Sequence, residues 1–192
     1  MTQLALIRHG HTPWNRAGRI QGRTDIDLDP DAVTELSGYK LPLAWVNAHL
    51  VSSPLKRASQ TAQIIAGRTP VLEDTLIEMN WGDWEGLCGV DLKADPNSGF
   101  RDIEHWGWNY QPPNGESPQD VWNRIEPWVL GLQSDTIAVC HIGIMRMILA
   151  KATGWNFDGP APFNIKRNRL FIIELEGGLH MENVAAIRLE KR

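Results

Sequence analysis

The order of the hydrophobic segments constrains the fold of this chain more than any other feature. Short apolar runs at 4–7, 48–51 and 136–140 each end in a polar turn, and helical patterns follow them. Runs of this length are typical of strands that are buried on both faces of a parallel sheet. The alternation predicts a three-layer α/β/α fold, in which helices cover both faces of a mainly parallel central sheet.

Serine followed by proline marks the starts of two of the expected helices. Ser53 is the expected N-cap of a helix over 54–66, and Ser117 is the expected N-cap of a helix over 118–132. Both segments repeat apolar residues at helical spacing. Another helical pattern follows the run at 136–140, and Gly154 is expected to end it.

Two further segments give weaker or different signals. The segment 31–46 predicts a helix, although Gly38 and Pro42 weaken its pattern. Towards the C-terminal end, apolar runs at 170–176 and 179–189 flank a Gly-Gly pair, which predicts a β-hairpin. The sheet is therefore expected to have an antiparallel edge strand.

Composition places the chain among ordinary globular proteins. Its 192 residues are 42% hydrophobic, which predicts one domain over 1–192 whose core needs no disulfide or structural metal. Cys88 and Cys140 lack metal-ligand spacing, and no apolar run suits a signal peptide or a membrane span. The net charge of −4 does not favour a nucleic-acid partner. We expect a cytoplasmic protein with no membrane partner, and the sequence does not indicate an oligomeric state.

Cationic and imidazole side chains stand where the predicted strands end. Arg8 and His9 follow the first strand, Arg57 lies in the first turn of the helix after the second, and His141 follows the run at 136–140. Ligands of open α/β sheets bind at this carboxyl edge of the strands. The helix dipole disfavours an arginine at a helix start unless an anion binds there, and guanidinium groups match phosphate oxygens. The sequence therefore predicts a phosphate pocket.

Five sequence blocks sharpen this prediction because they resemble the motifs of one family. They are LIRHGHTPWNRAGRIQGRTDIDL, VSSPLKRASQTAQIIA, EMNWGDWEG, PPNGES and AVCHIGIMR, in this order between residue 4 and about residue 150. The chain resembles the histidine phosphatase superfamily, also called phosphoglycerate mutase-like. The resemblance implies a phosphoglycerate mutase-like fold, and it favours the phosphatase branch, including α-ribazole phosphatase-like members.

The resemblance also implies a role for each residue of the pocket. His9 is implied as the nucleophile that takes up the phosphoryl group, and Glu78 as the acid/base. Arg8, Arg57 and His141 are implied to hold the phosphate oxygens, with His141 protonated when phosphate is bound. Because the arginines supply the positive charge, no metal ion and no cofactor are expected. Further substrate contacts are implied for Asn15, Gln21 and Gly22.

Three residues depart from the family pattern or stand beside the pocket. His11 replaces the usual Glu or Gln after the RHG motif, and it could either change the pocket's polarity or point to solvent. Ile142 stands where the family has a glycine, so a close backbone approach is less permissive there. Cys140 is most simply a buried strand residue, because a histidine nucleophile needs no thiolate beside it.

Tryptophan is unusually frequent, with nine residues against four Phe and two Tyr. Trp106 and Trp108 lie in the segment 87–117, where the family places a substrate-covering insertion. One interpretation is that this pair stacks on a ring-bearing substrate. The other is that the pair packs into a small core beneath an irregular loop.

Phosphatases and mutases share the implied catalytic residues, so other features must separate the two reactions. The compact length and the WEG and PPNGES blocks favour a phosphomonoesterase that acts on small phosphate esters. The alternatives are phosphoryl transfer of the phosphoglycerate mutase type and a catalytically silent phosphate-binding domain.

Overall fold

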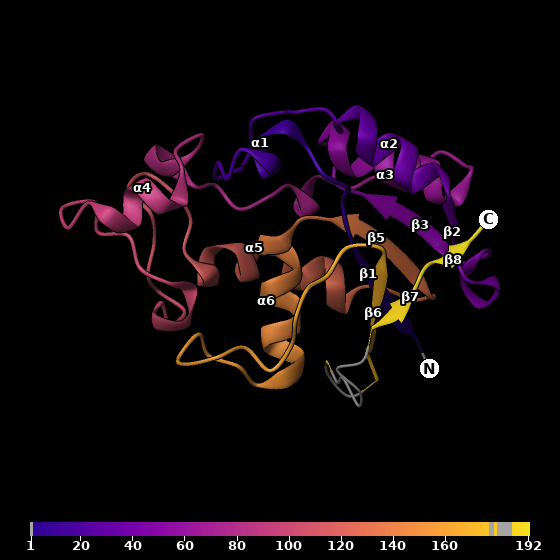
Figure 1. Cartoon of the computed structure of the whole chain (residues 1–192). Helices are drawn as coiled ribbons and strands as arrows, with labels where there is room; N and C mark the ends of the chain where they lie inside the picture. Colours follow the sequence, from indigo (N-terminus) through magenta and orange to yellow (C-terminus); the bar gives the residue numbers. More distant parts are fainter. Residues whose placement is uncertain (1, 177–178, 180–185) are drawn as a thin grey trace.

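A computed structural model describes residues 2–176, 179 and 186–192. The strands are β1 (Gln3–Arg8), β2 (Tyr39–Lys40), β3 (His49–Ser52), β4 (Val71–Leu72), β5 (Thr136–Cys140), β6 (Arg169–Glu174), β7 (Ile187–Arg188) and β8 (Glu190–Lys191). Within these residues, six strands form one sheet in the order β4-β3-β5-β1-β6-β7, and β2 pairs with β8 in a second, two-stranded sheet (Figure 1). Strands β4, β3, β5 and β1 pair in parallel. β6 runs antiparallel to β1, and β7 runs antiparallel to β6.

This mixed sheet confirms the predicted fold class. The antiparallel edge contains two strands, because β6 lies between β1 and β7. β6 and β7 pair antiparallel, as expected for the predicted hairpin, and within the described residues β7 spans Ile187–Arg188. The predicted Gly177-Gly178 turn lies outside the described residues.

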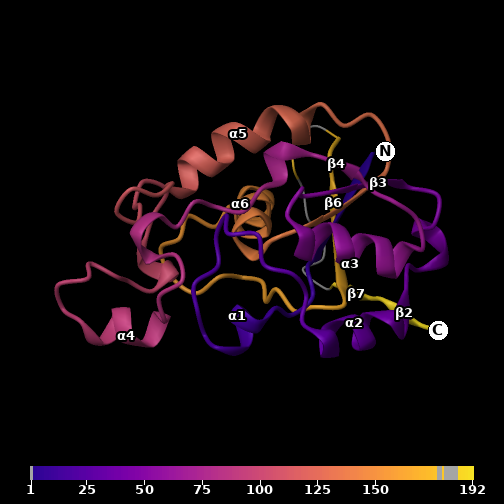
Figure 2. The same cartoon turned by 90° about the horizontal axis from the view of Figure 1, so that it is seen from above.

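Helices cover both faces of the main sheet. Among the described residues, the helices are α1 (Pro13–Arg16), α2 (Pro30–Ser37), α3 (Lys56–Ala66), α4 (Gly89–Ala94), α5 (Pro118–Leu130) and α6 (Ile142–Thr153). The short 3₁₀ turns are η1 (Leu43–Trp45), η2 (Asp74–Leu76), η3 (Gly82–Trp84) and η4 (Ile103–His105). α2 and α3 pack on one face, and α5 and α6 pack on the other (Figures 1 and 2). The three predicted layers are therefore present.

Strand β1 shows why an uninterrupted apolar run fits this position. Its successive side chains point to opposite faces of the sheet. Leu4 and Leu6 join the core beneath α5 and α6, while Ala5 and Ile7 join the core beneath α2 and α3. Because both faces are covered, every one of these residues must be apolar.

Two of the expected helices begin and end close to the predicted residues. Helix α5 starts at Pro118, and Ser117 and Asp120 form a reciprocal capping box at that end. It ends at Leu130, two residues before the predicted end. Helix α6 ends at Thr153, and Gly154 follows in the left-handed conformation with φ of 74°.

The predicted Ser53 cap and the predicted extent of the helix over 31–46 were wrong. Helix α3 begins at Lys56 rather than at residue 54, because the backbone N–H of Lys56 is satisfied by the Asp25 carboxylate at 2.8 Å instead of by a local Ser53 cap. The helix predicted over 31–46 ends at Ser37, and the chain then turns into β2 and η1.

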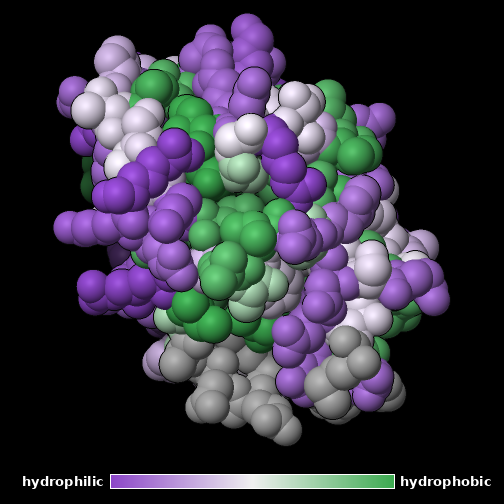
Figure 3. Space-filling model, turned by 90° about the vertical axis from the view of Figure 1, so that its right-hand side faces the viewer, coloured by the Kyte–Doolittle hydropathy of each residue, from purple (hydrophilic) through white to green (hydrophobic). Residues whose placement is uncertain are grey.

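The two ends of the molecule differ in shape and surface character. Residues around α4 form a lobe that projects from the helices, away from the chain termini (Figures 1 and 2). The opposite end shows hydrophilic side chains around a smaller hydrophobic area (Figure 3). Among the described residues, no helix combines the length and the apolar composition that crossing a bilayer requires.

Candidate active site

The predicted pocket residues converge at the carboxyl ends of three neighbouring strands. Arg8 and His9 leave β1, His141 leaves β5, and Arg57 lies in the first turn of α3, which follows β3. The backbone N–H of His9 extends the parallel pairing by donating to the Cys140 carbonyl at 3.0 Å. This pairing brings the imidazole rings of His9 and His141 to a centroid separation of 5.2 Å. The strand alternation thus places the whole cluster, as expected for an open α/β sheet.

His9 is held in a single, neutral form. It is buried, and its Nδ1 donates a hydrogen bond of 2.6 Å to the Gly10 carbonyl. That contact leaves Nε2 with a free lone pair. Burial, together with the positive charges of Arg57 and Arg8, holds the pKa of His9 well below its ordinary value. The imidazole is therefore uncharged at neutral pH, as a nucleophile must be.

Arg57 and His141 form a fully buried pair behind His9. The Arg57 Nε donates to His141 Nδ1 at 3.2 Å, so the His141 Nε2–H donates to the Ser53 hydroxyl at 2.7 Å. Burial and the Arg57 charge hold the pKa of His141 well below its ordinary value. His141 is thus neutral in the empty site, and its protonation on phosphate binding stays a prediction.

The remaining contacts of Arg57 fix its guanidinium in place. Two further N–H groups donate to the Thr24 and Gly22 carbonyls, at 2.9 and 2.6 Å. With the bond to His141, three of the five guanidinium donors are used. Arg57 is fully buried and does not line the reaction cavity. The Gly22 carbonyl accepts from Arg57, and Gly22 does not line the reaction cavity, so its implied contact with substrate stays a prediction.

The side chain of Glu78 contacts the first turn of helix α6. Its carboxylate accepts backbone hydrogen bonds from Met79 at 2.8 Å and from Gly143 at 3.1 Å. Burial raises the pKa of Glu78 above its ordinary value, while those two hydrogen bonds oppose the rise. A carboxyl with a raised pKa and a fixed orientation is suited to give and take protons.

A small cavity of about 170 Å³ opens between His9 and Glu78. Two buried donors near it, Arg8 Nε and Gln21 Nε2, have no hydrogen-bond partner. Burial lowers the pKa of Arg8 to about 9, so its guanidinium remains charged at neutral pH. Unpaired buried donors are rare in proteins and are expected where a ligand completes them. The lining consists of Arg8, His9, Asn15, Arg19, Ile20, Gln21, Glu78, Trp81 and Ile142.

The structure brings together most of the predicted site residues but not all of them. Asn15 and Gln21 line the cavity, and the Asn15 amide donates to the Gln21 carbonyl oxygen at 3.2 Å. Trp106 and Trp108 do not line it. Trp81, for which the sequence indicates no substrate contact, does line the cavity.

Trp106 and Trp108 belong to hydrophobic packing. Trp106 is buried, donates to the Arg101 carbonyl and packs edge-on against Trp81. Trp108 packs against Phe157, and its Nε1 donates to the Asn156 side chain. This placement agrees with the small-core interpretation, and a contact of either ring with substrate stays a prediction.

The residues that depart from the family pattern occupy distinct positions. Cys140 is fully buried, and burial raises the pKa of its thiol, which agrees with a structural strand residue. His11 is partly buried, and burial lowers its pKa. It does not line the reaction cavity, whereas Ile142 does.

Sequence reasoning missed Arg167, which precedes β6. Its Nε donates to the His9 carbonyl at 3.0 Å, and its terminal nitrogen donates to the Asn15 side chain at 2.9 Å. Its charge also contributes to the lowered pKa of His9, after burial, Arg57 and Arg8. No local motif marks this residue, because it reaches the site from 158 positions away along the chain.

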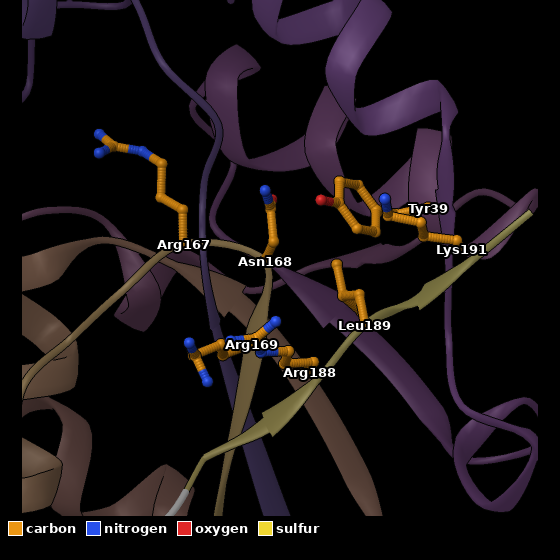
Figure 4. A pocket seen from close by; sticks show the side chains of 7 residues that line it. All are labelled: Tyr39, Arg167, Asn168, Arg169, Arg188, Leu189 and Lys191. Carbon is orange, nitrogen blue, oxygen red and sulfur yellow. The ribbon is translucent and has the colours of Figure 1, made fainter.

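Arg167 also borders a second, cationic cavity of about 480 Å³ at the antiparallel edge of the sheet. Figure 4 shows its guanidinium extending away from the other lining side chains. Arg169 lies directly opposite Arg188 in the β6–β7 pairing, so like charges face each other there. The lining residues are Tyr39, Arg167, Asn168, Arg169, Arg188, Leu189 and Lys191.

Comparison with known proteins agrees with this geometry. The family described as "Histidine phosphatase superfamily (branch 1)" matches residues 4–183. The chain belongs to this superfamily. In the part of the histidine phosphatase chain that the structure describes, no group of three or more His, Cys, Asp or Glu side chains is arranged to hold a metal ion.

Curated relatives include both phosphatases and mutases. A glucosyl-3-phosphoglycerate phosphatase of Mycolicibacterium vanbaalenii is 31% identical over 81% of this chain and 76% of its own length. A 2,3-bisphosphoglycerate-dependent phosphoglycerate mutase of Bartonella tribocorum is 32% identical over 80% of this chain and 82% of its own. The crystal structure of the TTHB049 protein from Thermus thermophilus covers 98% of this chain and 100% of its own, with a TM-score of 0.74 and 26% identity. The resemblance noted in the sequence is confirmed, and the chain is an enzyme of the histidine phosphatase type.

One glycine of this histidine phosphatase tests the placement of Glu78. A Cβ atom added at Gly143 would lie 2.3 Å from the Glu78 Oε1, a separation that real Cβ atoms essentially never show. We therefore expect Gly143→Ala to displace the carboxyl and to lower kcat for an alkyl phosphate, whose leaving group needs the Glu78 proton, by about 10²-fold, the usual cost of a misplacement near 1 Å.

The matched control is Gly89→Ala at the start of α4, where an added Cβ meets nothing within 4 Å. Both variants are compared by steady-state kinetics and by thermal melting. Equal activity of the two variants would contradict the assigned position of Glu78.

Proposed function

We propose that this histidine phosphatase is a phosphomonoesterase that hydrolyses small phosphate esters through a phosphohistidine on His9. The observation that carries the proposal is the state of His9. Its imidazole is buried and neutral, its Nδ1–H is held by Gly10, and its ring borders a cavity shared with Arg8 and Glu78. A nitrogen lone pair fixed in this way is a ready nucleophile, and a covalent intermediate divides the transfer into two easier steps.

In the first step, the His9 Nε2 lone pair attacks phosphorus in line with the ester oxygen. The N–P bond forms as the P–O ester bond breaks. Glu78, whose pKa is raised by burial, gives a proton to the departing alkoxide. The Gly10 carbonyl supports the phosphorylated ring, because it still accepts the Nδ1–H whose acidity has increased.

In the second step, the Glu78 carboxylate takes a proton from a water molecule, whose oxygen attacks phosphorus. The N–P bond breaks, and its electron pair returns to Nε2, so that His9 is neutral again and inorganic phosphate is released. The acid of the first step thus becomes the base of the second, and Glu78 ends protonated.

Positive charge around the cavity supports both steps. The equatorial phosphoryl oxygens gain negative charge. Arg8 lines the cavity and can stabilise that charge, and the buried Arg57 beside His9 adds positive charge without lining the cavity. The unpaired Nε2 amide of Gln21 adds a neutral donor, and Asn15 lies next to it. The site thus supplies charge and hydrogen bonds from side chains that are already in place.

The proposal extends to the kind of substrate and to the domain. A cavity of about 170 Å³ in a chain with a net charge of −4 supports a small phosphate ester, not nucleic acid, as the substrate. We place the whole histidine phosphatase domain at 1–192, with 87–117 as its substrate-covering segment, and its setting in the cytoplasm.

The test measures product and reaction class together. The chain is assayed with p-nitrophenyl phosphate and with 3-phosphoglycerate in the presence of a metal chelator. We expect release of inorganic phosphate from both. Conversion of 3-phosphoglycerate to 2-phosphoglycerate without phosphate release would establish the mutase alternative, and no turnover of either ester would contradict the proposal.

A further inference from the structure

The unpaired amide nitrogen of Gln21 can serve a phosphate only in one orientation of its side chain. Gln21 lines the reaction cavity, and among the described residues its buried Nε2 atom has no hydrogen-bond partner. Rotation of the amide by half a turn would exchange this donor for the carbonyl Oε1, which can only accept. An oxygen in that place would repel the phosphoryl oxygens that a donor stabilises. The contacts that hold the amide in its present orientation therefore matter for the reaction.

Two donors hold the Oε1 end of the Gln21 amide. The Nδ2 of Asn15 donates to it at 3.2 Å, and the Thr12 hydroxyl donates to it at 3.0 Å. Because both neighbours present donors, the oxygen of Gln21 faces them and its nitrogen is left for another partner. This arrangement requires Asn15 to present its nitrogen, and not its own oxygen, to Gln21.

Arg167 determines the orientation of Asn15. Its terminal nitrogen donates to Asn15 Oδ1 at 2.9 Å, and the Thr12 backbone N–H donates to the same oxygen at 3.2 Å. A guanidinium group has five donors and no acceptor, so only the oxygen of Asn15 can face it. Of these two bonds to Asn15, the one from Arg167 carries a charge and is the stronger.

The sheet explains why Arg167 can reach Asn15. Because β6 runs antiparallel to β1, the residues that precede β6 lie beside those that follow β1. Arg167 is two residues before β6, and its Nε donates to the carbonyl of His9, the first residue after β1, at 3.0 Å. The guanidinium is thus held at two points, and it cannot turn away from Asn15 without disturbing the bond to His9.

We propose that Arg167 is a positioning residue that orients Asn15 and, through it, the Gln21 amide, so that Gln21 Nε2 donates to a phosphoryl oxygen of the substrate. The inference rests on the proposed function and adds to it a residue from outside the contiguous motifs. Arg167 does not line the reaction cavity, so it acts through the two amides and not on the substrate itself. Without its charged donor, the neutral bonds from Thr12 alone would hold both amides less firmly.

The experiment tests whether Arg167 and Gln21 act as one unit. Arg167→Met, Gln21→Ala and the double variant are compared by kcat/KM for p-nitrophenyl phosphate and by the inhibition constant of inorganic phosphate. We expect each single substitution to lower kcat/KM and to weaken phosphate binding by about 10-fold, the usual worth of one hydrogen bond to a charged group. The double variant should lose no more than Gln21→Ala alone.

Conservative variants refine the result. Arg167→Lys should recover part of the loss, because an ammonium group still donates and cannot accept. Arg167→Gln should not recover it, because a neutral amide can accept as well as donate and no longer dictates which end of Asn15 faces it. This pair also carries the test if Arg167→Met does not fold, which thermal melting reports. Equal activity of the Lys and Gln variants would overturn the inference.

The matched control is Arg169→Met, two residues further along the chain. Arg169 lies in β6 opposite Arg188 and lines the cationic cavity, so kcat/KM and phosphate inhibition should stay at the wild-type level. Losses that multiply in the double variant would show that Arg167 acts without Gln21, for example through the His9 carbonyl. That result overturns the inference and leaves the phosphatase proposal standing. A wild type that releases no phosphate from any ester overturns the proposed function instead.

Discussion

Replacing His9 with alanine should reduce kcat for every phosphate ester by at least about 10⁴-fold, the order seen when a covalent nucleophile is removed. The buried ring that borders the cavity supplies the attacking nitrogen, and alanine offers no nucleophile in its place. Turnover is measured by phosphate release. The covalent step is measured by quenching the wild type and the variant in base after mixing with ³²P-labelled substrate, since phosphohistidine is labile in acid.

His49→Ala is the matched control, because His49 is exposed at the start of β3. It should retain both turnover and label, while His9→Ala should lose both. Labelling of the His9→Ala protein at the wild-type level would place the nucleophile elsewhere. Full turnover without any labelled intermediate in the wild type would favour direct attack by water.

Replacing Glu78 with glutamine should lower the rate of enzyme phosphorylation by an alkyl phosphate by about 10²–10⁴-fold, the usual contribution of a general acid. The alkoxide is a poor leaving group and needs the proton that Glu78 carries. With p-nitrophenyl phosphate the burst of p-nitrophenolate should be much less affected, because that leaving group needs no proton. Rapid-quench and stopped-flow measurements separate the two cases.

The pH dependence supplies a second readout for Glu78. Because burial raises its pKa, Glu78 keeps its proton above the pH at which an ordinary carboxyl loses it. The alkyl phosphate rate should therefore decline as pH rises through that raised pKa, and Glu78→Gln should lack this decline. His9 adds a limb only at low pH, because its pKa lies well below 6.5. Equal losses with both esters and an unchanged pH profile would assign Glu78 a structural role.

Contiguous motifs explain why so much of the site could be predicted from the sequence. His9 and His141 directly follow buried strands, so their strand patterns also fixed their place at the sheet edge. The start of α3 was harder, because its first N–H is satisfied by Asp25, 31 residues earlier in the chain. Local propensity cannot report a partner that only the tertiary fold supplies.

The same limit applies to Arg167, which sequence reasoning left unassigned. Arg167 reaches His9 across the sheet from a loop, and no spacing in the sequence predicts that contact.

The arginine cluster affects the free energy of unfolding of the protein. Arg167 repels Arg8, and Arg57, Arg8 and Arg167 all repel the protonated form of His9 in the folded state. An anion that occupies the site relieves that repulsion and binds only the native form. By linkage, ligand at 100 times its Kd adds about 2.7 kcal/mol to the free energy of unfolding. The folded protein should therefore unfold less readily with an anion in the site than with the site empty.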